Sequence, residues 1–233
     1  HEKTARVYGD HCLLTSNRNV MADINKIFQF LEYPEKGYGP LERCNTLLVS
    51  PISMRTGIES LINHEIKQAK AGKKAAITIK LNSLSDVSLI KKLNDAAVAG
   101  VTINMIVRGI FCALVDHKKF NTKPRAISIV DEYLEHARVM IFSNGGNPKV
   151  YISSADWMVR NIDHRIEAAV PILDAAIKKE LQDIIHIQLQ DNVKARVLDS
   201  ALLNNYVPLG SKKKIRSQIE TYLYLQQKTN SKK

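Results

Sequence analysis

The 233-residue sequence is poor in cysteine and contains no long hydrophobic run. Cys12, Cys44 and Cys112 stand singly, without a C-x-x-C pair, so neither a disulfide framework nor a cysteine-rich metal site is indicated. No apolar stretch approaches the roughly 20 residues that span a bilayer, and no signal peptide is visible. These absences favour a reduced, cytoplasmic protein. Because the first residue is His1 and not Met, we also expect further sequence upstream.

Common nucleotide-binding and hydrolase motifs are absent as well. The sequence contains no G-x-G-x-x-G, H-E-x-x-H or G-x-S-x-G. Gly72 and Lys73 resemble the end of a P-loop, but Lys67 replaces the first glycine of that motif and Lys74 replaces its Ser or Thr. Any nucleotide chemistry would therefore need a different phosphate cradle.

Positive charge is abundant and uneven. The formal net charge is +11, and residues 211–233 hold seven Lys or Arg and one Glu. Such a balance favours anionic partners. The alternative for the last few residues is a solvated tail. Only Tyr222 and Tyr224 accompany the basic run, which argues against a base-stacking platform, and we expect no nucleic-acid partner.

Apolar runs of strand length alternate with helical segments along most of the chain. The helical segments carry apolar residues at helical spacing, as Met21, Ile24 and Phe28 do. Such alternation is typical of βαβ units. We therefore expect an α/β fold with a mixed, mostly parallel sheet flanked by helices, and a C-terminal helical segment. The expected strands are 46–50, 75–81, 101–107, 126–130, 138–142, 150–153 and 165–171, and the expected helices are 20–31, 53–71, 86–99, a short one around 132, 175–189 and 214–226.

One histidine stands beside an expected hairpin of polar residues. His136 directly precedes a strand, and Arg138 lies on the same face because side chains alternate along a strand. The partner strand ends at Ser153 and Ser154, close to Asp156. A histidine can attack phosphorus or protonate a leaving oxygen, and arginine can neutralise phosphate oxygens. The residues alone are equally compatible with a structural histidine.

Further charged residues stand at strand ends. Arg165 and Glu167 belong to the next expected strand, Arg108 precedes Gly109 at the end of another, and Lys80 ends a third. Ligand sites in parallel α/β sheets collect beyond the carboxyl ends of strands. Phosphate binding is one interpretation of Arg108 and Lys80, and a surface salt bridge is the other. The histidines that stand at no ligand spacing are interpreted as structural: His11, His64, His117, His164 and His186.

Together these segments closely resemble the second catalytic half of polyphosphate kinases. The histidine segment Tyr133-Leu-Glu-His136-Ala-Arg138 and the hairpin segment Tyr151-Ile-Ser-Ser-Ala-Asp156-Trp-Met-Val-Arg160 carry the strongest similarity. The resemblance covers nearly the whole chain, through segments 2–10, 13–15, 80–86, 106–109, 125–130, 133–138, 144–146, 150–163, 193–196 and 205–208.

The resemblance implies a phospholipase-D-like fold in which two C-terminal domains each contribute a histidine to one site. Residues 1–45 would end the first domain, 46–210 would form the second, and 211–233 would form a basic C-terminal helix and tail. The implied reaction is reversible transfer of the terminal phosphate of ATP onto inorganic polyphosphate, with Mg²⁺, through a phosphohistidine. ATP, ADP and polyphosphate would be the ligands. The family also suggests a homo-oligomer and some association with the inner membrane face.

By the same resemblance, His136 is the second histidine, acting as a general acid or as an alternative phosphate acceptor. The phosphorylated histidine and much of the ATP and Mg²⁺ site belong upstream. We therefore assign no metal ligand within this chain, and we expect the chain alone to be inactive or severely impaired. The assigned residues are His136, Arg108 and Tyr8 for catalysis, Arg138, Arg165, Lys80 and Ser154 for substrate or phosphate binding, and Asp10, Asp156 and Glu167 in support.

Two other functions stay open. A phospholipase-D-like phosphodiesterase or nuclease would use similar histidine chemistry without ATP, although that pattern has Lys where Arg138 stands. A non-catalytic anion-binding module would instead use the basic C-terminus, and it would not need His136.

Overall fold

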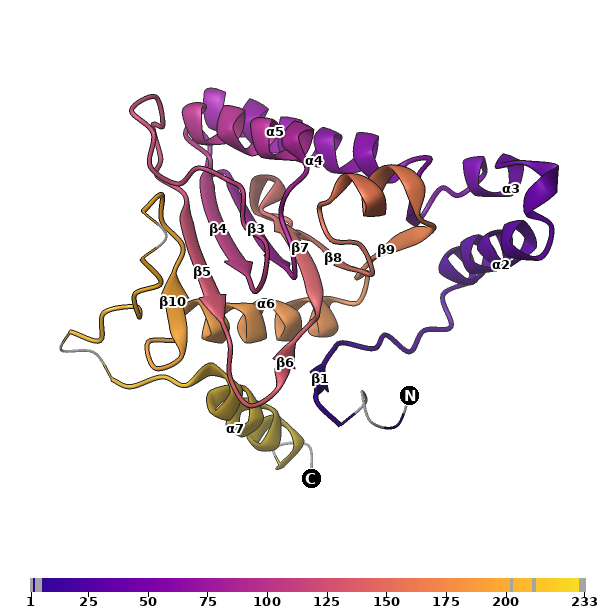
Figure 1. The fold of residues 1–233 in the computed structure, drawn as a ribbon. Coiled ribbons are helices and arrows are strands. Elements are labelled where there is room, and N and C mark those ends of the chain that lie inside the picture. The colour runs from indigo at the N-terminus through magenta and orange to yellow at the C-terminus, as the bar shows by residue number, and fades with distance from the viewer. Residues whose placement is uncertain (1, 3–5, 202, 211–212, 231–233) are drawn as a thin grey trace.

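An eight-stranded mixed sheet with helices on both faces forms the body of the molecule (Figure 1). The computed structural model describes residue 2 and residues 6–201, 203–210 and 213–230. Two helices cover one face of the sheet, a third covers the other, and a fourth packs beside the third. The helices of the body, in that order, are α4 (Met54–Lys70), α5 (Val87–Val98), α6 (Ala175–Leu189) and α7 (Ser217–Asn230).

The sheet order is β10-β5-β4-β3-β7-β8-β9-β2. The strands of the large sheet are β2 (Leu48–Ser50), β3 (Ala76–Leu81), β4 (Thr102–Val107), β5 (Arg125–Ile129), β7 (Arg138–Phe142), β8 (Lys149–Ser153), β9 (Glu167–Pro171) and β10 (Ala195–Val197). A separate pair joins β1 (Tyr8–Gly9) to β6 (Leu134–Glu135) in parallel.

The α/β fold with a mixed sheet is confirmed, but the expectation of mostly parallel pairing is wrong. Among the described strands of the large sheet, only β3–β4 and β4–β5 are parallel. The other five pairs are antiparallel. A short turn joins β7 to β8 and returns the chain in the opposite direction, and residues 154–166, which include a helical turn, return it again from β8 to β9. The parallel neighbours need crossover connections, and these are helix α5 between β3 and β4 and the loop of residues 108–124 between β4 and β5.

Side chains that alternate along the central strands build two cores. Ile77 and Ile79 of β3 face the side covered by α4 and α5, in a core that also holds Trp157. Ile106 of β4 faces the opposite side and packs in the core that includes Ile185 of α6. Each face of the sheet is therefore apolar because alternate residues of the same strand are apolar.

The first helical segment lies beside the sheet and has a small core of its own (Figure 1). It consists of α2 (Arg18–Glu32), the helical turn η1 (Pro34–Lys36) and α3 (Gly39–Glu42). Buried Asp23 of α2 ties this segment to β2 by accepting hydrogen bonds from the amides of residues 45–47 at 2.7–3.0 Å. The expected domain limits at 45/46 and 210/211 stay predictions, and residues 1, 211, 212 and 231–233 lie outside the described residues.

Two local expectations differ from the structure. The short helix expected around residue 132 is absent, because Arg216 pairs with Asp131 and Glu132 and the chain runs on into β6. The strand expected from Arg165 starts at Glu167, after the helical turn η3 (Arg160–His164). The hairpin turn contains a 3₁₀ turn, η2 (Asn144–Gly146). In addition, β1 and β10 are too short to give a periodic signal.

In the described part of the chain, no helix is both long enough and apolar enough to cross a membrane.

Candidate active site

The start of β7 lies at the sheet edge where β3 and β4 end. Antiparallel pairing sets Lys80 of β3 opposite Val139 of β7. His136 and Arg138 therefore come to the carboxyl edge of the two parallel strands, where ligand sites of α/β sheets collect. Arg138 pairs in turn with Ser153 at the end of β8. The hairpin thus brings the polar end of one strand against the histidine end of the other, as expected from the sequence.

A pocket of about 650 Å³ opens at this edge. The volume falls within the range of small-molecule sites, roughly 300–1,000 Å³. Its lining comes from the segment after β1 and from β7, β8 and β9. The lining residues are Asp10, His11, His136, Ala137, Arg138, Ile152, Ser153, Ser154, Arg165, Glu167, Ala168 and Val170.

His136 is oriented by Arg138, which is close to it in sequence, and by Tyr8 and Asp10 from near the N-terminus. Its Nδ1 lies 3.4 Å from the Asp10 carboxylate and 3.2 Å from Nη1 of Arg138. An arginine only donates, so its contact needs a lone pair on Nδ1, whereas a carboxylate only accepts, so its contact needs a proton there. The two neighbours therefore favour opposite tautomers. The Tyr8 ring meets the imidazole edge-on at a centroid distance of 4.7 Å, and 26% of the His136 side chain stays exposed.

Buried Asp156 holds Arg138 in place. The guanidinium donates to both carboxylate oxygens, through Nε at 3.2 Å and Nη2 at 3.1 Å. The same carboxylate accepts the amides of Asn82 at 2.8 Å and Ser83 at 3.0 Å. Burial by itself raises the pKa of Asp156, but the hydrogen bonds and charge of Arg138, together with these amides, outweigh it and leave the pKa below its ordinary value. Asp156 is thus an ionised anchor for Arg138.

Glu167 is held by its neighbours on the far side of the pocket. It accepts a close hydrogen bond from the Ser154 hydroxyl and one from Nδ2 of Asn161 at 2.7 Å. Arg165 lies 4.0 Å from Glu167, at the distance limit of an ion pair, and 57% of its side chain is exposed. Since its guanidinium is only loosely engaged, Arg165 is the cation of this pocket best placed to accept an anionic ligand.

Arg108 lies outside the pocket but is linked to it. Its guanidinium donates a close hydrogen bond to Oδ1 of Asn82, whose own amide contacts Asp156. Its buried Nε has no hydrogen-bond partner among the described residues. The next residue, Gly109, packs tightly on the neighbouring chain, because a Cβ there would lie 2.9 Å from the Asn82 carbonyl oxygen. The predicted contact of Arg108 with phosphate stays a prediction.

Lys80 is placed differently from its predicted role. Its ammonium is 2.9 Å from the Glu135 carboxylate and 3.3 Å from the Ala137 carbonyl oxygen, and only 2% of the side chain is exposed. Burial lowers the pKa of Lys80, and the charge of Glu135 opposes that shift. Lys80 is not among the described residues that line the His136 pocket, so in this structure it braces the chain on either side of His136.

His11 was expected to be structural, yet it lines the pocket beside Asp10. It is largely buried, and burial followed by the charge of Lys80 lowers its pKa. Only the parallel pairing of β1 with β6, which sets Gly9 opposite Glu135, carries Tyr8, Asp10 and His11 to His136. The one signal in the sequence was the position of His11 directly after Asp10.

The described residues contain no group of three or more His, Cys, Asp or Glu that could hold a metal ion. The expected requirement for Mg²⁺ stays a prediction.

A histidine, two arginines and a held carboxylate thus lie together at the carboxyl edge of a mixed α/β sheet, and these are groups that phosphoryl transfer uses. The family model "Polyphosphate kinase C-terminal domain 2" matches residues 47–218, and "Polyphosphate kinase C-terminal domain 1" matches residues 1–37. The chain belongs to the polyphosphate kinase family, and the resemblance seen in the sequence is confirmed.

Individual relatives agree with this membership. The polyphosphate kinase of Vibrio parahaemolyticus is 50% identical over 97% of this chain, and that of Escherichia coli K12 is 45% identical over 97%. The crystal structure of polyphosphate kinase from Porphyromonas gingivalis matches 93% of the chain and 33% of that protein, with a TM-score of 0.88 and 40% identity. The chain spans about a third of the length of the curated relatives, with 32% of each covered.

A phospholipase D family member, Nuc from Salmonella typhimurium, is only 16% identical with a TM-score of 0.49. That score is too low to carry the phospholipase-D-like part of the predicted fold.

Proposed function

We propose that this chain provides one half of the active site of an ATP–polyphosphate phosphotransferase, which reversibly moves the terminal phosphate of ATP onto inorganic polyphosphate. The observation that carries the proposal is the pocket in which His136, Arg138 and Arg165 meet, in a chain of the polyphosphate kinase family. The name of the relatives supplies the reaction, and the pocket supplies groups suited to it.

The charges of the pocket suit a phosphate group. Asp156 engages Nε and Nη2 of Arg138, whereas Nη1 lies on the side of His136, so this edge of the guanidinium faces the pocket. Arg165 is exposed and loosely engaged. The Glu167 carboxylate, which would repel an anion, is already occupied by Ser154 and Asn161. Guanidinium groups bind phosphate oxygens through paired hydrogen bonds, so the two arginines can neutralise charge that develops on the transferred group.

The contacts of His136 suit proton transfer or phosphate acceptance. When Arg138 donates to Nδ1, the proton lies on Nε2, and the imidazole can donate it to a leaving oxygen. When Nδ1 keeps the proton and donates a hydrogen bond to Asp10, the lone pair lies on Nε2, and the imidazole can accept a phosphoryl group there. The hydrogen-bond partner of Nδ1, Arg138 or Asp10, therefore selects between the two roles that the family resemblance leaves open for His136.

The remaining parts of the proposal rest on the family. We propose that the covalent phosphohistidine, most of the ATP site and the ligands of Mg²⁺ come from sequence outside this chain. We also propose a homo-oligomer in the cytoplasm with some association with the inner membrane face.

The decisive experiment is His136→Ala in the enzyme that includes the upstream half. We expect ATP-dependent synthesis of polyphosphate to fall by at least about 100-fold, since acid–base catalysis alone contributes 10²–10⁴-fold. The matched control is His64→Ala, because His64 lies exposed on α4, where its ring contacts the side chain of Gln68. Both variants should unfold at the same urea concentration as the parent.

Two outcomes would remove the proposal. Full activity of His136→Ala would favour a non-catalytic anion-binding module. Hydrolysis of a phosphodiester without nucleotide would favour a phosphodiesterase or nuclease. A third result tests the division of the site: polyphosphate synthesis by the 233-residue chain alone, at the rate of the longer enzyme, would contradict the upstream phosphohistidine.

A further inference from the structure

The chain segment that carries His136 is held from behind by the C-terminal helix. Gln218, in the first turn of α7, makes three hydrogen bonds to this segment. Its Nε2 donates to the Tyr133 carbonyl oxygen at 2.8 Å and to Oε1 of Glu135 at 2.8 Å, and its Oε1 accepts the Tyr133 amide at 3.1 Å. One side chain therefore fixes both the backbone and the carboxylate immediately before His136.

The Glu135 carboxylate connects this clamp to the other side of His136. Its Oε2 accepts Nε2 of Gln188 from α6 at 3.0 Å and pairs with Lys80 at 2.9 Å. Lys80 also donates to the carbonyl oxygen of Ala137, the residue after His136. Gln218 and Lys80 thus bracket the histidine, with Glu135 as their shared acceptor in the buried interior.

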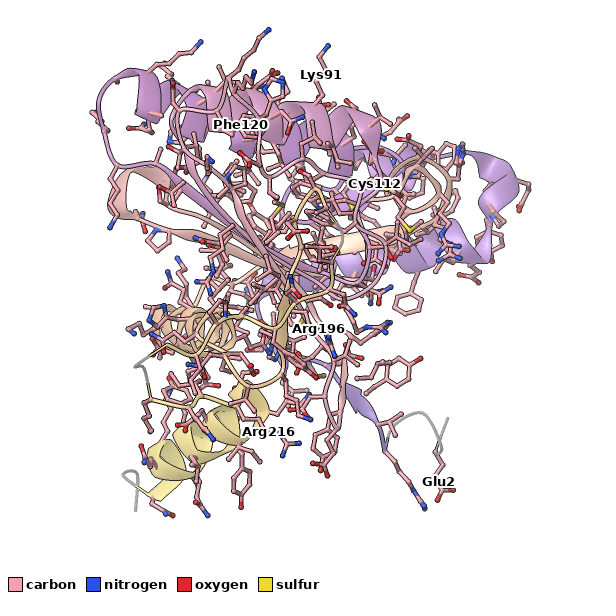
Figure 2. All side chains as sticks on the ribbon, turned by 60° about the vertical axis from the view of Figure 1, so that its left-hand side comes forward. Glu2, Lys91, Cys112, Phe120, Arg196 and Arg216 are labelled. Carbon is pink, nitrogen blue, oxygen red and sulfur yellow. The ribbon has the colours of Figure 1, made fainter. Side chains whose placement is uncertain are left out.

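The start of α7 is itself firmly placed. Asp191 accepts the Ser217 amide at 2.7 Å, and Arg216 makes two hydrogen bonds to Asp131 at 2.7 and 2.8 Å. Figure 2 shows Arg216 at the point where the chain enters this helix. The Asp131 side chain is 1% exposed, so this ion pair lies at the protein surface only on the arginine side. Because the start of α7 is fixed in this way, the hydrogen bonds of Gln218 can hold the segment before His136 in place.

We propose that Gln218 is a positioning residue for His136, acting through Glu135 and the backbone of Tyr133. The proposal rests on the proposed function for its kinetic consequence, but the structural link does not depend on it. The basic C-terminal segment accordingly helps to position His136, in addition to any contact it makes with anions.

The test uses Gln218→Ala and Gln218→Met, with Gln226→Ala as the matched control on the same helix. Met keeps the length and volume of Gln but none of its hydrogen bonds, so it separates the clamp from simple packing. Gln226 is exposed, so Gln226→Ala removes the same side chain from α7 at a position away from Glu135. The thermal midpoint of each variant shows whether the chain remains folded.

The first readout is the ring signal of His136 in a ¹H–¹³C spectrum of the 233-residue chain, which needs no substrate. We expect it to shift or broaden in both Gln218 variants and to stay unchanged in Gln226→Ala. The second is steady-state synthesis of polyphosphate by the longer enzyme. We expect kcat to fall about tenfold, less than the ~100-fold cost of a 1 Å misplacement, with KM for ATP changed by less than about twofold.

An unchanged His136 signal in folded Gln218→Met would overturn the proposal, whatever the activity. Normal activity of Gln218→Met with loss only in Gln218→Ala would also overturn it, because packing would then suffice. The two proposals can fail separately. If the His136 signal shifts in the Gln218 variants but the unsubstituted longer enzyme makes no polyphosphate, the link between Gln218 and His136 stands and the proposed function is wrong.

Discussion

Compared with the strap of residues 8–11 on one side of the His136 pocket, the hairpin wall on the other side is far more tightly held. The hairpin wall comprises Arg138, Ser154, Asp156 and Glu167, and each of these side chains has at least one hydrogen bond within the wall. The strap is joined to β6 over two residue pairs, and its Tyr8 is 39% exposed. The same pocket therefore has one rigid wall and one wall held by few contacts.

The two walls of the pocket differ in what they contribute to it. The hairpin wall supplies fixed positive charge, because buried Asp156 locks Arg138 from a position close in sequence. The strap supplies Tyr8 and Asp10, which contact His136 from the N-terminal part of the chain, Asp10 from 126 residues away in the sequence. We expect changes in the hairpin wall to affect both stability and activity, and changes in the strap to affect activity alone.

The largest effect is expected from Arg138→Ala. Removing one partner of a buried ion pair leaves the other unpaired, and such changes cost about 3–5 kcal/mol; because two backbone amides still serve Asp156, we expect about 2–3 kcal/mol here. Urea unfolding measures this loss, and polyphosphate synthesis should be abolished. Arg160→Ala is the control, since its side chain is exposed and is not part of the wall. Equal stability of the two variants would contradict a rigid hairpin wall.

A smaller and more selective effect is expected from Tyr8→Ala. Loss of the ring that meets His136 edge-on should lower kcat about tenfold, because misorientation of a catalytic group is costly. The free energy of unfolding should change by less than about 0.5 kcal/mol, as at most exposed positions. Tyr8→Phe keeps the ring contact and should restore the rate. A stability loss as large as that of Arg138→Ala would end the distinction between the two walls.

The smallest effect is the pH dependence of stability that Asp156 confers. Its folded-state pKa is lowered, so its contribution is fully present above its unfolded value, near pH 4, and is lost as the pH falls through the lower folded value. Urea midpoints between about pH 6 and pH 3 should therefore fall more steeply in the parent than in Asp156→Asn. Parallel curves for the two proteins would show that Asp156 is not an ionised anchor.

Much of the hairpin wall could be predicted because its information is local. Alternation along a strand puts His136 and Arg138 on one face, and a short turn forces the return strand to end beside them. The helix from Ala175 to Leu189 is likewise predicted with its observed limits, since the apolar spacing that indicates it lies within the segment itself.

The strap, the partner of Lys80 and the role of α7 could not be predicted in the same way. Lys80 ends a strand at the ligand edge, where a phosphate contact was a reasonable expectation, but the fold places Glu135 at its ammonium. The resemblance to the family pointed to Tyr8 and Asp10, whereas His11 carried no signal of its own. Gln218 lies 83 residues from Glu135 along the chain, and nothing near it in the sequence marks it.

The sequence by itself determined the alternation of strands and helices, the placement of Arg138 beside His136, and membership of the polyphosphate kinase family. Periodicity, turn chemistry and co-linear motifs are properties of neighbouring residues, so they can be seen without a fold. The tertiary structure alone decided that most strand pairs are antiparallel, that residues 8–11 reach His136, and that Gln218 and Lys80 bracket it. These contacts depend on which distant segments pack together, and that outcome is set by burial of the whole sheet, not by any local pattern.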